Sequence, residues 1–106
     1  MALTRDTKET VAVRGSKEPE FARALLDEVL TLLLNGEPDT SKLILRDLIN
    51  ATVGFEGLST EIHKPSKTIH RMLSVTGNPT VENFSSILTS IQKHMKVQVK
   101  ALVISL

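Results

Sequence analysis

The distribution of apolar and polar residues predicts a chain built from several amphipathic helices. A first helix is expected to begin at Pro19, a residue favoured in the first turn of helices, and to end at Asn35-Gly36. Its apolar residues recur at intervals of about three or four and are Phe21, Leu25, Val29, Leu32 and Leu33. This spacing places them on one face of the helix, which we expect to pack in the core.

A second amphipathic helix is expected after a polar turn at residues 36–39. Thr40 or Ser41 can cap its first turn, since a side-chain hydroxyl accepts a hydrogen bond from an unpaired helix amide. Its apolar face comprises Ile44, Leu45, Leu48, Ile49 and Thr52. Gly54 is expected to end the helix.

Two short helices are predicted next. The first contains Phe55, Leu58 and Ile62 at i, i+3, i+7 spacing, and His63-Lys64-Pro65 interrupts it. Pro65 is suited to begin the second, which we place from Ser66 to Leu73. The apolar side of this second short helix is formed by Ile69, Met72 and Leu73. Two short helices joined by a tight turn have the layout of a helix-turn-helix.

A last long helix is predicted after the turn at Gly77-Asn78-Pro79. Gly77 is free to adopt a positive φ in this turn, and Thr80 followed by Asn83 resembles an N-terminal cap. The buried stripe of the helix is expected to be Val81, Phe84, Leu88, Ile91 and Met95.

The last residues, 96–106, follow a different period. Apolar side chains here alternate with polar ones, and the alternating residues are Val97, Gln98, Val99, Lys100, Ala101 and Val103. Alternation predicts a half-exposed strand. A lone strand requires a partner, and the simplest partner is a second copy of the chain.

The fold class that follows is all-α: a bundle of five to six helices with a helix-turn-helix and either a short strand or a tail at its C-terminus. The sixth helix would lie at residues 5–14, where Thr4 can cap a helix although Val11 and Val13 alternate as in a strand. We expect one domain over residues 1–106, divided into an N-terminal helical region (1–36), a helix-turn-helix core (40–95) and a C-terminal strand or tail (96–106).

Composition narrows the class of protein. A chain of 106 residues with 41% hydrophobic residues can bury one core. It contains no cysteine, so disulfides and thiolate metal sites are excluded and a reducing, cytoplasmic location is expected. No apolar run approaches the roughly 18 to 20 residues that span a bilayer, so no membrane partner is expected.

Charge is unevenly distributed along the chain. Residues 1–62 carry seven basic and eleven acidic side chains, a net charge of −4. Residues 63–106 carry six basic side chains and one acidic side chain, a net charge of +5, so the total is +1. Between His63 and Asn78 there are three basic residues, two histidines and no acidic residue. A local positive field of this kind favours a polyphosphate partner, although opposite halves can also promote self-association.

The basic residues gather on one side of the short helix from Ser66 to Leu73. At about 100° per residue, Lys67, His70, Arg71 and Ser74 share the face opposite Ile69, Met72 and Leu73. Such a helix fits the DNA major groove, where Arg71 is the best candidate to read a guanine. Lys64, Ser66 and Asn78 are expected to contact phosphates. An ordinary solvated helix shows the same pattern, and that interpretation stays open from spacing alone.

Other chemistry finds little support. Of the three histidines only His63 and His70 are close in sequence, and no carboxylate or cysteine shares their spacing, so neither a metal site nor another cofactor is expected. No nucleophile elbow, oxyanion loop or phosphate-binding glycine motif occurs. We therefore expect no catalytic residues and no enzymatic activity.

The chain resembles the small bacterial helix-turn-helix transcriptional regulators of the phage-repressor (Cro/cI-like) superfamily, including antidote proteins of toxin–antitoxin modules. The resemblance rests on Thr4-Arg5-Asp6, Lys8-Glu9-Thr10-Val11, Leu45-Arg46-Asp47-Leu48-Ile49-Asn50-Ala51-Thr52, Gly54-Phe55-Glu56, Lys64-Pro65-Ser66-Lys67, Arg71-Met72-Leu73 and Gly77-Asn78-Pro79-Thr80. By similarity, Leu58-Ser59 falls at the buried Leu-Ala step of the first motif helix and Ile69 at the apolar anchor of the second. Two positions differ: His63 stands where the turn often has glycine, and Pro65 replaces the usual serine cap.

The resemblance implies a lambda-repressor-like fold and a cytoplasmic homodimer that binds a palindromic operator in double-stranded DNA. It also implies a repressor that can serve as the antitoxin of a module, with a RelE-like toxin as partner. The alternative is a protein-interaction module that neutralises a toxin through the acidic N-terminal half or the tail, with DNA binding secondary.

Overall fold

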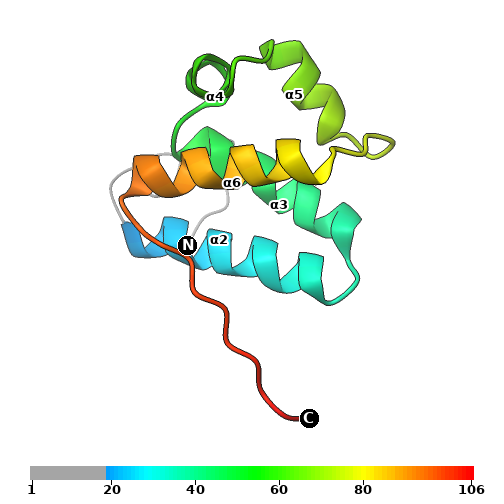
Figure 1. Cartoon of the computed structure of the whole chain (residues 1–106), viewed down its shortest axis with the longest axis vertical. Coiled ribbons are helices and arrows are strands. Elements are labelled where there is room, and N and C mark those ends of the chain that lie inside the picture. Colours follow the sequence, from blue (N-terminus) through cyan, green and yellow to red (C-terminus); the bar gives the residue numbers. More distant parts are fainter. Residues whose placement is uncertain (1–18) are drawn as a thin grey trace, which may run out of the picture.

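The computed structural model describes residues 19–106 and shows an all-helical architecture over that range (Figure 1). The helices are α2 (Pro19–Leu34), α3 (Pro38–Ala51), α4 (Phe55–Ile62), α5 (Ser66–Met72) and α6 (Val81–Met95). The prediction of an all-α fold is thereby confirmed. The sixth helix predicted at residues 5–14 lies outside the described residues.

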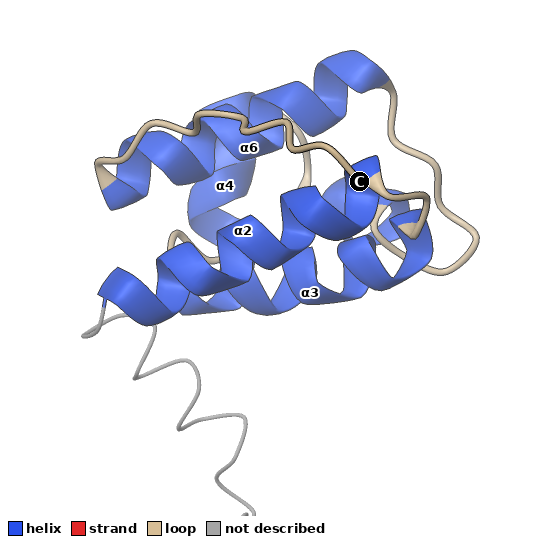
Figure 2. Ribbon diagram, turned by 90° about the horizontal axis from the view of Figure 1, so that it is seen from below, coloured by secondary structure: helices blue, strands red, loops and turns tan. Residues whose placement is uncertain are grey.

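Helix α6 crosses the middle of the molecule, with α4 and α5 on one side of it and α2 on the other (Figure 1). Viewed from the α2 side, α2 and α3 lie next to each other and form the layer opposite α4 and α5 (Figure 2). One apolar cluster joins these layers, and its fully buried members are Val29, Leu45, Leu48, Ile49, Leu58, Ile69, Leu73, Ile87 and Ile91. Every described helix therefore contributes to one core.

The packing of α2 against α3 departs from the predicted cap. Helix α3 begins at Pro38, with Glu37 before it, so Thr40 and Ser41 both lie inside the helix. Ser41 is instead buried, and its hydroxyl donates a hydrogen bond of 2.7 Å to the Val29 carbonyl of α2. The prediction of a Thr40 or Ser41 cap is wrong because proline itself starts the helix, which frees the Ser41 hydroxyl to bind the neighbouring helix.

The other predicted boundaries are close to those observed. Helix α2 spans the predicted segment, although its most buried residues, Ala22, Leu26 and Val29, define a face rotated slightly from that of Phe21 and Leu25. Helix α3 ends at Ala51, before Gly54, which has a positive φ of 79° immediately ahead of α4.

Helix α6 is capped as the sequence predicts. The Thr80 hydroxyl accepts a hydrogen bond of 3.0 Å from the Asn83 amide. Of the predicted stripe, Ile91 is fully buried and Phe84, Leu88 and Met95 pack partly buried against the core, whereas Val81 is 86% exposed and does not belong to it. Ile87, which was not predicted, is also fully buried.

Residues 97–106 form an extended tail with no strand pairing within residues 19–106. The tail leaves the end of α6 and runs away from the helices on the side opposite α4 and α5 (Figure 1). Of the predicted alternatives, this single chain therefore shows a tail. Its side chains are largely exposed, including Leu102 at 85% and Val103 at 92%.

Candidate nucleic-acid interface

Helices α4 and α5 and the turn between them, residues 63–65, form the unit that presents the predicted basic side chains. His63 ends α4 in the left-handed conformation (φ 58°, ψ 43°). The Ser59 hydroxyl donates to the Lys64 carbonyl at 2.5 Å, and the Lys64 amide donates to the Ser59 carbonyl at 3.2 Å. The left-handed residue reverses the chain and the two hydrogen bonds hold the turn against α4.

Pro65 immediately precedes α5, with φ −59° and ψ 142°. Its carbonyl accepts hydrogen bonds from the Thr68 amide at 2.9 Å and the Ile69 amide at 3.1 Å, which start the helix. Ile69 and Leu73 are fully buried, and Met72 is buried beside them. The prediction that these three residues anchor one side of α5 is confirmed.

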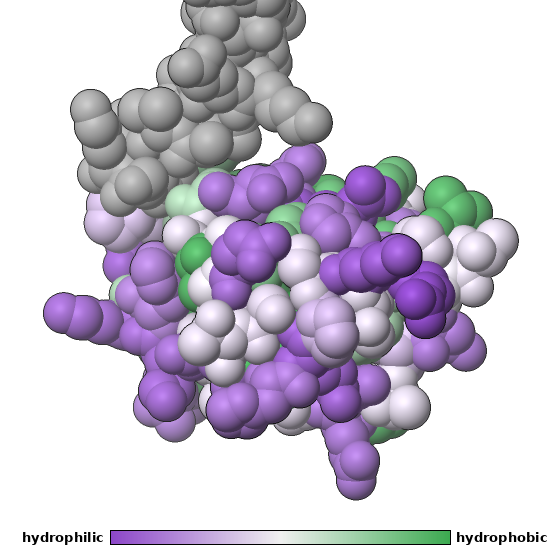
Figure 3. Space-filling model, turned by 90° about the horizontal axis from the view of Figure 1, so that it is seen from above, coloured by the Kyte–Doolittle hydropathy of each residue, from purple (hydrophilic) through white to green (hydrophobic). Residues whose placement is uncertain are grey.

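The opposite side of α5 is open to solvent. Lys67, His70 and Arg71 are all exposed, and we call the surface made by these three side chains the α5 face. Among residues 19–106, the ion pairs are Arg23 with Glu20 and Lys42 with Asp39, so neither Lys67 nor Arg71 is neutralised by a carboxylate in that range. Seen from the side of α4 and α5, the surface is mostly hydrophilic (Figure 3). Lys64, in the turn, and Ser66, the first residue of α5, are half-buried.

His70 is less free than its exposure implies. Its imidazole ring stacks on the Phe55 ring at the start of α4, with 3.9 Å between ring centroids and 15° between planes. One surface of the imidazole therefore packs on α4, and only the remainder of the ring can contact a ligand.

Ser74 and Asn78 lie beyond the helix. Because α5 ends at Met72, the predicted place of Ser74 on the helical face is wrong. The Ser74 hydroxyl donates to the Arg71 carbonyl at 2.8 Å and so caps the end of α5. Asn78 is exposed in the loop that leads to Thr80, the cap residue of α6.

Gly77 in this loop is required for a different reason from the one predicted. Among residues 19–106 the glycines with positive φ are Gly36 and Gly54, so the predicted positive φ of Gly77 is wrong. A Cβ atom at Gly77 would instead lie 2.0 Å from the Arg71 carbonyl oxygen and 2.6 Å from that of Met72. Glycine is needed because the loop packs directly on the last turn of α5.

Sequence reasoning missed Lys42, which fixes this loop from α3. Its side chain is only 11% exposed, and its Nζ donates to the Gly77 carbonyl at 2.7 Å and to the Ser74 carbonyl at 3.1 Å. A signal was present in the sequence, since Lys42 lies three residues before Leu45 and therefore on the apolar face of α3. A lysine on the apolar face of a helix needs polar partners, because an unpaired buried charge is costly.

The two acidic side chains of α4 lie outside the predicted basic segment. Glu56 is exposed in the first turn, and one Glu61 oxygen accepts a hydrogen bond of 3.2 Å from the buried Ser90 hydroxyl of α6. Glu61 thus links α4 to α6, while Lys64, Lys67 and Arg71 follow it without an intervening acid.

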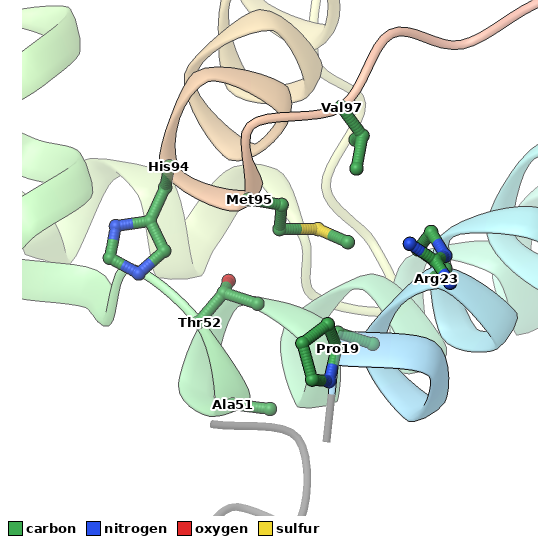
Figure 4. Close-up of a pocket in the computed structure, with 8 residues that line it drawn as sticks. Pro19, Arg23, Ala51, Thr52, His94, Met95 and Val97 are labelled. Carbon is green, nitrogen blue, oxygen red and sulfur yellow. The ribbon is translucent and has the colours of Figure 1, made fainter. Parts of the chain in front are cut away.

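A small pocket lies away from the α5 face, where the ends of α2, α3 and α6 meet (Figure 4). Its volume is about 160 Å³, below the roughly 300 to 1,000 Å³ of small-molecule sites. The lining residues are Pro19, Ala22, Arg23, Ala51, Thr52, His94, Met95 and Val97. We assign no ligand to it.

Neither a metal-ligand cluster nor a membrane span occurs among residues 19–106. No three His, Asp or Glu side chains in that range are grouped so that they could hold a metal ion. None of the helices in the same range is both long and apolar enough to traverse a bilayer.

Comparisons of the chain with protein-family models, with curated proteins and with solved structures gave no match.

Proposed function

We propose that this protein is a sequence-specific DNA-binding transcriptional regulator in which α4 and α5 act as a helix-turn-helix. The observation that carries the proposal is the two-sided character of α5: Ile69 and Leu73 are fully buried, whereas Lys67 and Arg71 are exposed and unpaired among residues 19–106. The helices of the unit have eight and seven residues and are joined by residues 63–65, which matches the short-turn layout of the motif.

The dimensions of α5 suit the major groove. An α-helix with its side chains is about 10 to 12 Å in diameter, and the groove is about 12 Å wide. In this arrangement Arg71 reads a base edge, preferably guanine through its two donor groups, and Lys67 contacts the same groove. Lys64, Ser66 and Asn78 flank α5 and are placed to contact phosphates, which set the register of the protein on the duplex.

We propose further that the protein acts as a homodimer on a palindromic operator, with the tail supplying the contact between subunits. The backbone of residues 98–106 has one intramolecular hydrogen bond within the described chain, from the Val99 amide to the Gln92 side chain at 2.8 Å. An extended apolar segment with free backbone groups is a template for strand pairing. Because the tail lies opposite α4 and α5, pairing there leaves the α5 face open.

Selection of bound sequences from random duplex DNA tests the proposal. The purified full chain is expected to enrich a palindrome, since the two-fold symmetry of a dimer is mirrored in its operator. A double variant, Lys67→Met with Arg71→Met, serves as the control and is expected to enrich no sequence. Enrichment by that variant equal to the wild type would place DNA binding elsewhere on the protein.

The exposed tail also favours a second function, neutralisation of a partner protein by strand addition. The resemblance to antidote proteins names a RelE-like toxin as the candidate. Co-expression with the product of a neighbouring toxin-like gene tests this function: the full chain is expected to copurify with it. Removal of residues 100–106 is expected to abolish copurification, and retention of the partner by the shortened chain would exclude the tail as its binding site.

A further inference from the structure

Lys42, on α3, binds the loop that follows α5. Its Nζ lies 2.7 Å from the Gly77 carbonyl oxygen, 3.1 Å from the Ser74 carbonyl oxygen and 3.5 Å from Asp39 Oδ1. The ammonium donates hydrogen bonds to the two carbonyl oxygens and forms an ion pair with the exposed Asp39 carboxylate. These two hydrogen bonds and the ion pair compensate for the removal of this charge from water.

The position of the ammonium is favourable electrostatically. Helix α5 ends at Met72, and the Ser74 carbonyl lies just beyond that end. The C-terminal end of a helix carries partial negative charge on its unpaired carbonyl groups, which attract a cation. Lys42 is therefore bound at the end of α5 although it belongs to α3, and it joins two segments that are 32 to 35 residues apart.

The loop at residues 74–78 connects Lys42 to the side chains that we propose contact DNA. Gly77 packs so closely on the Arg71 carbonyl that a Cβ atom would lie 2.0 Å from it, and the Ser74 hydroxyl donates to the same carbonyl at 2.8 Å. Gly77 therefore packs on the last turn of α5, which carries Arg71, and its displacement removes a contact from that turn. Asn78 directly follows Gly77 and would move with it.

The other end of α5 has a different support. Its start is held by the turn to α4 through Ser59, and its middle by Ile69 in the core and by the His70 ring on Phe55. The end of α5 is itself anchored by Met72 and Leu73 in the core, so the loop at residues 74–78 is the part that is held from α3.

From these contacts we propose that Lys42 is a positioning residue for DNA recognition, acting on Arg71 and Asn78 without touching DNA itself. This inference rests on the proposed function, because it concerns the geometry of the same face. The inference gives Lys42 and Lys67 different roles. Lys67 is exposed and is proposed to contact the nucleic acid, whereas the Lys42 ammonium already binds protein oxygens.

Two matched substitutions, Lys42→Met and Lys67→Met, test the proposal, since each removes one ammonium and keeps most of the side-chain stem. Affinity for the selected operator is measured at several salt concentrations, together with amide hydrogen exchange of residues 74–78. Lys42→Met is expected to lower affinity about tenfold, because binding must then order the loop, and to leave the salt slope unchanged. Lys67→Met is expected to reduce the salt slope by about one phosphate contact.

Hydrogen exchange distinguishes positioning from a merely structural contribution. With Lys42→Met, exchange at residues 74–78 is expected to accelerate at temperatures where exchange in the core of α3 is unchanged. Lys42→Arg, which retains donors and charge, is expected to restore at least half of the lost binding free energy, and Lys42→Gln replaces Lys42→Met if the latter does not fold. An unchanged affinity and unchanged loop exchange in folded Lys42→Met, or in Lys42→Gln in its place, would overturn the inference, and so would a reduced salt slope.

A failure of the proposed function has a different signature. In that case the wild-type chain selects no sequence and shows no salt-dependent DNA binding, whatever residue stands at position 42. Faster exchange of the loop in Lys42→Met would then still report the attachment of Gly77 to α3, while the assignment of that attachment to DNA recognition would be wrong.

Discussion

The imidazole of His70 lies nearly parallel to the ring of Phe55, 3.9 Å away between centroids, and this stack joins the middle of α5 to the first residue of α4. Both residues also belong to larger features, because His70 is part of the α5 face and Phe55 is 8% exposed at the edge of the core. The stack is therefore a contact between the proposed reading helix and its support.

Replacement of His70 by phenylalanine separates packing from polar recognition. His70→Phe keeps an aromatic ring on Phe55 and removes the ring nitrogens, so DNA affinity within about threefold of wild type is expected if the ring mainly packs. His70→Ala is expected to destabilise the fold by about 0.5 to 1.5 kcal/mol, the value of an aromatic pair beyond its buried area. Chemical denaturation and DNA titration of both variants provide the test, and a large affinity loss in His70→Phe would show that a ring nitrogen contacts DNA.

Substitutions of Arg71 and Lys64 are expected to weaken DNA binding in different ways. Arg71→Ala removes a base contact, so it should cost about 1 to 3 kcal/mol on the selected operator and relax the sequence preference. Lys64→Ala removes a phosphate contact, so it should weaken all duplexes similarly and flatten the dependence on salt. Gel-shift titrations with the operator and a scrambled duplex at two salt concentrations measure both effects. Unchanged affinity in both variants would contradict the assignment of this face.

His63 carries the backbone strain of the turn between α4 and α5. Its φ of 58° is in the left-handed region, which costs an L-residue about 1 to 2 kcal/mol. Glycine adopts this conformation without that cost but loses about 0.5 to 1 kcal/mol through its greater freedom when unfolded. His63→Gly is therefore expected to raise the free energy of unfolding by roughly 0.5 to 1 kcal/mol, measured by chemical denaturation. A loss of stability would mean that the His63 side chain makes a compensating interaction.

Gly77 and Gly57 give a matched pair of glycine-to-alanine substitutions. The Cβ of Gly77→Ala would meet two backbone carbonyls, so the loop must shift, and a loss of about 1 to 3 kcal/mol is expected. The Cβ of Gly57→Ala lies 3.1 Å from a Val53 side-chain methyl, and alanine is favoured over glycine in a helix by about 1 kcal/mol. Thermal or chemical unfolding should therefore rank Gly77→Ala as clearly the less stable variant, and equal stabilities would argue against tight packing at Gly77.

Removal of residues 100–106 tests the role of the tail in self-association. Leu102, Val103, Ile104 and Leu106 are exposed in the single chain, and full burial of such side chains contributes about 1.5 to 3 kcal/mol each. The full chain is expected to be a dimer by light scattering, and the shortened chain a monomer with the same helical circular dichroism. Lys100→Ala is the control and should remain dimeric. A dimer of undiminished affinity in the shortened chain would move the interface to the helices.

The sequence alone determined most of the local structure. The periodicity of apolar residues located the described helices, Pro65 marked the start of α5, and the hydroxyl of Thr80 was recognised as the cap of α6. The exposure of Lys67 and Arg71 followed from the same periodicity, because a helix that buries Ile69, Met72 and Leu73 on one side turns the opposite side outward.

Only the tertiary structure decided which groups meet across the chain. The approach of Lys42 to Gly77, the burial of the Ser41 hydroxyl against Val29 and the stacking of His70 on Phe55 depend on how separate helices pack. Helical periodicity is a local property that states which side of each helix is apolar, whereas the partner of a buried polar group depends on the relative placement of elements distant in sequence. For that reason the side chains of the α5 face could be predicted, and the residue that holds the end of α5 in place could not.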